Sequence, residues 1–154
     1  MLRVFKRKVR PVSVEKSAFH GFANPVDPSA AELRAWAYQP DSVPLQALPK
    51  DWDLLVAGDR LIPTLFELAM APSCPARRFA LHCLHIYAAD AIRTNFRSHR
   101  RRRLRKLVKR AAGQGDEPML TWAHNCQMLL TKPDLFNYPD WFEGGLVRNP
   151  RRLA

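Results

Sequence analysis

Apolar residues recur at helical spacing along most of the chain from residue 29 to residue 131. The segment 76–96 is apolar around most of a helical circumference, a pattern typical of a helix that packs on several sides. We therefore expect it to be the central helix. The next segment, 98–112, has a single apolar stripe at positions i, i+3, i+4 and i+7, formed by Leu104, Leu107, Val108 and Ala111. The segment 116–131 has a comparable inward face made of Met119, Trp122, Ala123, Cys126, Leu129 and Leu130.

Capping signals mark shorter helices in the N-terminal half of the chain. Ser29 followed by Glu32 has the spacing of a capping box, and it predicts a helix over residues 30–38. Asp51 and Asp59 each precede a short apolar segment, and an aspartate at such a position can accept hydrogen bonds from the free N–H groups of the first turn. We therefore predict that both aspartates are helix caps.

Helix ends in the C-terminal half are marked by glycine, aspartate and proline. Gly113 is expected to end the segment 98–112, Asp116 to cap the following helix and Pro133 to stop it. The stretches 133–138 and 139–145 are then predicted to form single-turn helices whose bulky apolar residues close one end of the core.

These elements predict an all-α fold in one domain. A chain of 154 residues is long enough for a single hydrophobic core without disulfides or metals. We expect an extended basic N-terminal arm over residues 1–28, a compact bundle of about five main helices over 29–147, and a basic C-terminal tail over 148–154. The three longest segments resemble a HEAT-like antiparallel stack in their lengths and order, although no repeated sequence accompanies the likeness.

Positive charge is concentrated in two segments, and this pattern bears on function. The net charge is +11, and more than half of the 25 Lys and Arg residues fall within residues 1–10 and 97–110, neither of which contains an acidic residue. Concentrated charge of this kind attracts anions, whereas the remainder of the chain is slightly acidic. The candidate anion-binding residues are Lys6, Arg7, Lys8, Arg97, Arg100, Arg101, Arg102, Arg103, Arg105, Lys106, Lys109 and Arg110.

The position of the basic segment relative to helix ends leaves two possibilities open. If a new helix starts at Ser98, Arg100 to Arg103 crowd its N-terminus, where positive charge opposes the helix dipole and an anion would relieve the cost. If the central helix continues through Ser98, the arginines lie in mid-helix and form a long cationic ridge. The sequence does not separate the two.

These patterns point to non-catalytic binding. The first hypothesis is a nucleic-acid-associated or regulatory protein whose cationic helix contacts phosphates with little reading of bases, because the polar face is almost wholly Arg and Lys. The alternative is a helical adaptor that grips an acidic protein partner, with Trp36, Trp52 and Trp141 as anchors if they are exposed. A membrane surface ranks below both, because the few apolar residues of the basic segment are needed for packing.

Signals of enzymatic chemistry are missing from the sequence. It contains no nucleophile elbow, no phosphate-binding glycine loop and no zinc-protease motif. The densest group of possible metal ligands combines His82, Cys83 and His85 with His124 and Cys126, but its spacing matches no strong zinc signature. We therefore expect packing roles for these residues, no catalysis, no metal and no cofactor.

Asp90 and the cysteines complete the set of singled-out residues. Asp90 extends an apolar stripe of the central helix, so we expect it to be buried and paired with Arg93 or Arg97, anchoring the basic segment.

The three cysteines are irregularly spaced, which argues against a secreted disulfide framework, and residues 1–10 lack the apolar core of a secretory signal. No apolar run has the length of a membrane span. A cytoplasmic protein is the expectation.

Overall fold

The computed structural model describes residues 19–96, 99–137 and 141, and within them the chain is all-helical. Six α-helices and three short 3-10 turns follow one another, and no strand occurs in this part of the chain. The α-helices are α1 (Ala30–Tyr38), α2 (Trp52–Val56), α3 (Ile62–Met70), α4 (Arg77–Arg93), α5 (Arg100–Gln114) and α6 (Glu117–Thr131). The turns are η1 (Pro40–Ser42), η2 (Leu45–Ala47) and η3 (Pro133–Leu135). The predicted all-α bundle with five main helices is confirmed.

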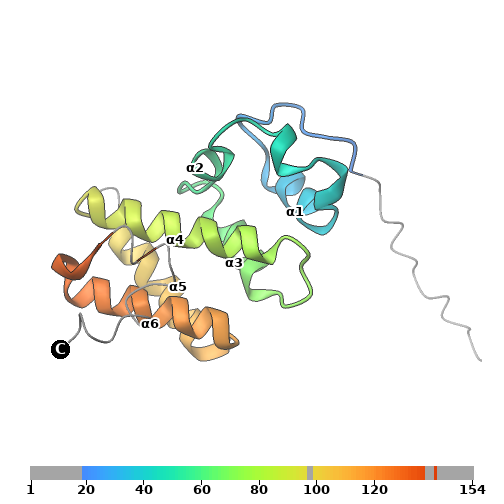
Figure 1. Cartoon of the computed structure of the whole chain (residues 1–154). Helices are drawn as coiled ribbons and strands as arrows, with labels where there is room; N and C mark the ends of the chain where they lie inside the picture. Colours follow the sequence, from blue (N-terminus) through green and yellow to red (C-terminus); the bar gives the residue numbers. More distant parts are fainter. Residues whose placement is uncertain (1–18, 97–98, 138–140, 142–154) are drawn as a thin grey trace, which may run out of the picture.

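Helix α4 is the centre of the bundle, as the sequence predicts. It contacts α2, α3, α5 and α6, and it runs between the N-terminal elements and the α5–α6 pair (Figure 1). Its buried side chains cover several faces, including Leu84, Ile86 and Tyr87. Helices α5 and α6 pack extensively on each other and are joined by only two residues, which makes them a helical hairpin.

The N-terminal part packs through aromatic rings around the start of α1 and α2. The capping box of α1 is confirmed: the Ser29 hydroxyl accepts from the Glu32 N–H, and the Glu32 carboxylate accepts from the Ser29 N–H. Phe22 lies against Trp52 with ring centroids 5.3 Å apart, so the described end of the predicted arm packs on the body. Residues 1–18 lie outside the described part.

Three predicted aspartate caps behave differently from expectation. Asp51 and Asp116 stand at the N-cap positions of α2 and α6, but neither side chain caps the helix, and Asp51 has a left-handed backbone with φ of 58°. Asp59 lies before the first turn of α3, whose N-cap is Leu61. The N-cap positions predicted for Asp51 and Asp116 are therefore correct, but the predicted capping hydrogen bonds are not formed. Asp59 and Asp116 accept from distant arginines instead, and the left-handed backbone of Asp51 departs from the extended conformation usual at an N-cap.

The boundary between α4 and α5 is a break, so the two are separate helices. Helix α4 ends at Arg93, and Asn95, Phe96 and His99 have left-handed φ values of 53°, 58° and 60°. This conformation is costly for residues other than glycine, and it cannot continue a right-handed helix. Arg100 therefore begins a new helix, which settles the question that the sequence leaves open. Arg97 and Ser98 lie outside the described residues.

At the C-terminal end, η3 confirms the first of the two predicted turns. Of the second predicted turn, 139–145, only Trp141 is described. Its ring is buried, and its Nε1 donates to the His85 carbonyl oxygen at 2.8 Å, which fixes this residue on α4. The predicted tail over 148–154 lies outside the described part.

None of the helices in the described ranges combines the length and the apolar character needed to cross a membrane.

The α5–α6 hairpin supplies a prediction from its two glycines. Gly113, where the sequence predicts the helix end, lies inside α5, and the helix runs on to Gln114. A Cβ on the following Gly115 would lie 2.5 Å from the Ala111 carbonyl oxygen and 2.7 Å from the Met119 Cβ. We expect Gly115→Ala to lower the free energy of unfolding by about 1–3 kcal/mol, because this overlap must be relieved by moving backbone.

Gly113→Ala is the matched control for that prediction. A Cβ at Gly113 meets nothing within 4 Å, and alanine favours a helix interior, so this change should raise stability by about 0.5–1 kcal/mol. Urea denaturation followed by circular dichroism measures both. Equal effects of the two substitutions would contradict the close packing of the hairpin turn.

Candidate anion-binding face of helix α5

Helix α5 has two opposite faces with the same spacing. Its buried stripe is the predicted one, at i, i+3, i+4 and i+7, and it faces the core. The exposed residues two positions earlier repeat that spacing and so lie about 200° away around the helix. All of them are cationic. We call Arg102, Arg105, Lys106 and Lys109 the cationic face.

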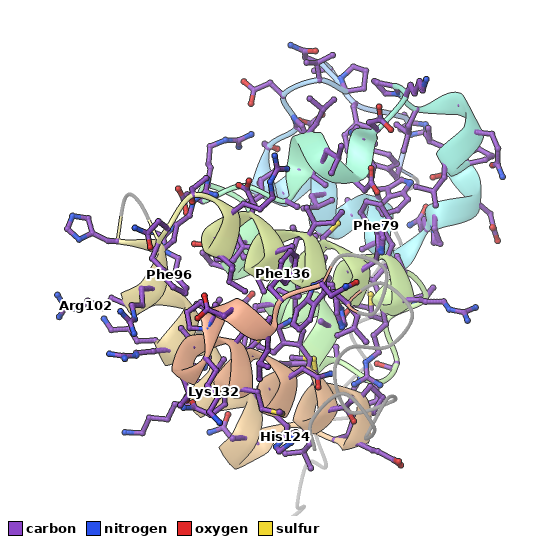
Figure 2. The ribbon with its side chains drawn as sticks, turned by 60° about the vertical axis from the view of Figure 1, so that its left-hand side comes forward. Phe79, Phe96, Arg102, His124, Lys132 and Phe136 are labelled. Carbon is purple, nitrogen blue, oxygen red and sulfur yellow. The ribbon has the colours of Figure 1, made fainter. Side chains whose placement is uncertain are left out.

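The cationic face carries no neutralising partner in the described part of the chain. No hydrogen bond, ion pair or ring contact to its four side chains is found there, and all four are exposed. In Figure 2 Arg102 extends away from the other helices. Helix α5 contains no acidic residue along its 15 residues, so nothing within the helix offsets the charge.

Other basic residues of α5 form ion pairs and hydrogen bonds within the protein. Arg100 and Arg103 form ion pairs with the Asp59 carboxylate, at 3.4 Å from Arg100 Nε and 3.2 Å from the nearer Arg103 nitrogen. Arg103 also donates to the Asp59 carbonyl oxygen at 2.8 Å. The Tyr87 hydroxyl donates to the same carboxylate at 2.8 Å. Asp59 thus joins the loop before α3 to α4 and α5, a role that its expected position as a cap does not suggest.

Asp90 is the second acidic partner of α5. The sequence predicts a buried Asp90 paired with Arg93 or Arg97. The carboxylate is instead partly exposed and forms an ion pair with Arg100. The prediction of burial is wrong, and Arg100 is a partner that the sequence did not suggest, because the break after α4 folds the start of α5 back toward Asp90. Its expected role, anchoring the basic segment to the central helix, is what the pair does.

The pKa values of this cluster follow from its burial and its charges. Burial raises the pKa of Tyr87 well above its usual range, and the hydrogen bond to Asp59 adds to the rise, so the phenol stays protonated as a donor. For Arg100, burial acts to lower the pKa, but the hydrogen bond to Asp90 and the charge of Asp59 raise it overall. The guanidinium is therefore firmly charged.

Arg101 and Arg110 lie over aromatic rings at the edges of α5. The Arg101 guanidinium is 5.1 Å from the ring centroid of Phe96, and the Arg110 guanidinium is 5.0 Å from that of Phe66. Such contacts hold the side chains against the body of the protein through cation–π attraction. Both keep their positive charge, so they flank the cationic face and add to its field.

The positive charge at the N-terminus of α5 is partly neutralised by acidic side chains of the protein itself. Positive side chains here oppose the helix dipole, and the sequence predicts that an anion would relieve the cost. Asp59 and Asp90 supply two such anions, both directed at Arg100. The four residues of the cationic face are left outside this arrangement. The predicted set of anion-binding residues therefore divides into structural and solvent-facing members, while Lys6, Arg7, Lys8 and Arg97 lie outside the described residues.

Removing the Asp59 carboxylate tests the structural members. We expect Asp59→Ala to lower the free energy of unfolding by about 1–2 kcal/mol, because it leaves the Tyr87 hydroxyl without its acceptor and takes one partner from two arginines. The loss is moderate since the carboxylate is 37% exposed. Asp27→Ala is the control: it breaks an exposed pair with Arg60 and should cost less than about 0.5 kcal/mol. Thermal unfolding of both variants measures the difference.

The histidines and cysteines singled out in the sequence are not gathered into one site. His82 Nε2 lies 2.9 Å from the Asp53 carboxylate, and the ring of His85 packs at 5.3 Å from that of Trp141. His124 is exposed on α6 (Figure 2), whereas Cys83 and Cys126 are buried, and burial raises the pKa of both thiols. Within the described ranges no three His, Cys, Asp or Glu side chains are arranged to hold a metal ion.

The tryptophans that could have anchored a protein partner belong to the core. Trp36, Trp52 and Trp141 are each at most 3% exposed. The Nε1 atoms of the first two donate to the carbonyl oxygens of Val43 and Pro25. Their rings hold this chain together, and none of them presents a surface to a partner.

Comparison of the chain with models of protein families, with curated proteins and with solved structures finds no match.

Proposed function

We propose that this protein binds the phosphate groups of nucleic acid through the cationic face of α5, without catalysis. The observation that carries the proposal is that Arg102, Arg105, Lys106 and Lys109 are exposed together on one helix face with no acidic partner in the described part of the chain. Other arginines of the same helix do have acidic partners, so the lack of partners is a property of this face and not of the helix.

The dimensions of the face suit a phosphate backbone. From Arg102 to Lys109 the helix rises about 10 Å, over which one strand of B-form DNA carries about three phosphates. The four long side chains also reach beyond the two ends of this length, so with one phosphate each they can contact about four phosphates. Arg and Lys pair with phosphates whatever the base sequence, and the face has no Asn or Gln to read adenine, so we expect most of its contacts to position the protein on the backbone.

A salt series on the wild-type protein tests the proposal. With about four phosphates contacted, the logarithm of the association constant should fall with the logarithm of salt concentration with a slope near −3.6, about 10²-fold between about 50 and 200 mM salt. Fluorescence anisotropy with labelled duplexes of different sequence measures it, and the slope should be the same for each. No binding at about 50 mM salt, or binding that salt leaves unchanged, would contradict the proposal.

An acidic protein partner is the alternative that uses the same face. The burial of the tryptophans removes the aromatic anchors on which that alternative depends. Competition separates the two: a nucleic-acid ligand is displaced by another nucleic acid of equal charge, whereas an acidic polypeptide such as polyglutamate should compete poorly.

A further inference from the structure

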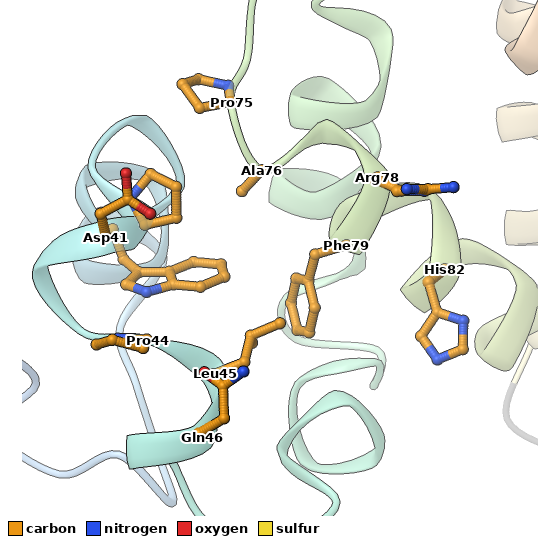
Figure 3. A pocket seen from close by; sticks show the side chains of 11 residues that line it. Asp41, Pro44, Leu45, Gln46, Pro75, Ala76, Arg78, Phe79 and His82 are labelled. Atoms are coloured by element: carbon orange, nitrogen blue, oxygen red, sulfur yellow. The ribbon is translucent and has the colours of Figure 1, made fainter.

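A groove lies between the first turns of α4 and the segment that follows α1, away from α5. Its volume is about 530 Å³, within the range of about 300–1,000 Å³ usual for sites of small ligands. Figure 3 shows its two walls, one formed by η1 and η2 and the other by α4. No residue of α5 lines it, so it is distinct from the cationic face.

The floor and much of one wall of the groove are apolar. The rings of Trp36 and Phe79 meet edge to face with centroids 5.2 Å apart. The Trp36 Nε1 already donates to the Val43 carbonyl oxygen at 2.9 Å, so the polar atom of the indole is satisfied within the protein. Leu45, a lining residue on the opposite wall, is 47% exposed. Because Trp36 is already buried, the carbon surface that an apolar ligand can cover belongs to Phe79 and Leu45, and covering it is favourable.

One wall of the groove carries a positive charge without a counter-ion. Arg78 is exposed, and it has no ion pair or hydrogen bond to any described residue. It belongs to the first turn of α4, which has no acidic side chain and no side-chain cap, so the helix dipole adds to the field of the guanidinium. His82, one turn later on the same wall, is held by the Asp53 carboxylate at 2.9 Å.

The opposite wall carries the reverse charge. Asp41 lines the groove from η1 and stands across from Arg78 in Figure 3. A ligand with one anionic end can place it at Arg78 and keep its uncharged part near Asp41. A second negative charge at the opposite end of the ligand would lie toward Asp41 and be repelled.

We infer that this groove binds a small apolar monocarboxylate. The carboxylate pairs with Arg78, and the apolar body lies against Phe79 and Leu45. This assignment adds a second site to the protein and is independent of nucleic-acid binding. The charges on the two walls set its specificity: an acid is preferred over its uncharged amide by the Arg78 contact, and over a dicarboxylate by Asp41.

Titration with three probes of similar shape tests the inference. 3-Phenylpropionate, 3-phenylpropionamide and 3-(4-carboxyphenyl)propionate, whose second carboxylate lies at the far end of the ring, are added to the ¹⁵N-labelled full chain, and amide chemical shifts are followed. The monocarboxylate should shift the Arg78 and Phe79 amides saturably and bind about tenfold more tightly than the other two, since a charged contact of this kind is worth about that factor. Equal affinity for acid and amide, or shifts away from these residues, would overturn it.

Two variants and a control locate the site. Arg78→Gln should weaken 3-phenylpropionate binding about tenfold, and Leu45→Trp, which fills the groove, should abolish it. Both positions are exposed, so both variants should keep the wild-type spectrum elsewhere. Lys50→Gln makes the same change of charge outside the groove and should leave the affinity as it was. Unchanged binding by Arg78→Gln, or loss of binding by Lys50→Gln as well, would refute the assignment.

Discussion

Replacing Arg105, Lys106 and Lys109 together by glutamine should weaken binding to duplex DNA by about 10²- to 10³-fold at about 0.1 M salt. Each lost phosphate contact removes about 0.9 from the magnitude of the salt slope, so three lost contacts remove about 2.7. Extrapolated affinities at about 1 M salt should then coincide for the variant and the wild type, because release of counter-ions no longer favours binding there. Arg102 is kept so that the first turn of α5 is untouched.

The matched control for this variant changes Arg34, Lys50 and Arg60 to glutamine. These residues are exposed, lie outside α5 and give the same change in net charge. At about 0.1 M salt the Debye length is about 10 Å, so charges away from the contact contribute little, and the control should stay within about fivefold of the wild type. An equal loss in both triple variants would mean that the general charge of the protein, and not the cationic face, carries the binding.

Trp122→Ala should lower the free energy of unfolding by about 3–5 kcal/mol, the usual cost of removing a large aromatic ring from a packed core. Trp122 is fully buried on α6, with its ring 6.2 Å from that of Phe66 on α3. It therefore fills the space between the α5–α6 hairpin and the rest of the bundle. The melting temperature should fall by roughly 10 °C or more.

Trp122→Phe separates the packing of the ring from its hydrogen bonding. The Nε1 of Trp122 has no hydrogen-bond partner in the described part of the chain, so phenylalanine loses volume but no bond. We expect a smaller cost than for Trp36→Phe, which also leaves the Val43 carbonyl oxygen without its donor at 2.9 Å. Calorimetric melts of the three variants rank them, and a Trp122→Phe variant as unstable as Trp122→Ala would contradict this account.

The helices and their buried sides were predictable because one periodicity governs both. A 3.6-residue repeat places Leu104, Leu107 and Val108 on one side whatever they pack against, and all three are buried. The capping box at Ser29 was predictable for a similar reason, since its two partners are three residues apart.

Partners far apart in the chain were not predictable. Asp59 meets Arg103, which is 44 residues later, and Asp116 meets Arg77, which is 39 residues earlier. The Arg77 guanidinium holds the pKa of Asp116 below its usual range. Nothing local distinguishes these aspartates from the caps that their sequence positions suggest. For the same reason the sequence predicted anion binding for every cation of α5. The fold instead pairs some of them with Asp59 and Asp90 and leaves others exposed to solvent.

The groove beside α4 was not predictable from the sequence either. Its walls come from η1, η2 and α4, and they meet because Trp36 and Phe79 pack together. In the sequence, Arg78 is one more arginine outside the two basic blocks. Arg78 becomes a candidate ligand-binding residue because an apolar surface lies beside it, and that surface forms only when distant segments pack together.

The opposition of two faces on α5 links ligand binding to folding. As an isolated segment, α5 would bring many like charges together with no core to hold the helix, so the cationic face exists only while Leu104 and its neighbours are packed. A phosphate polymer that binds this face prefers the folded state, because the unfolded chain no longer holds the four cations on one side of a helix. By mass action the proposed binding would stabilise that state by at most RT ln(1 + [L]/Kd), so we expect the stability of the protein to rise with the concentration of nucleic acid.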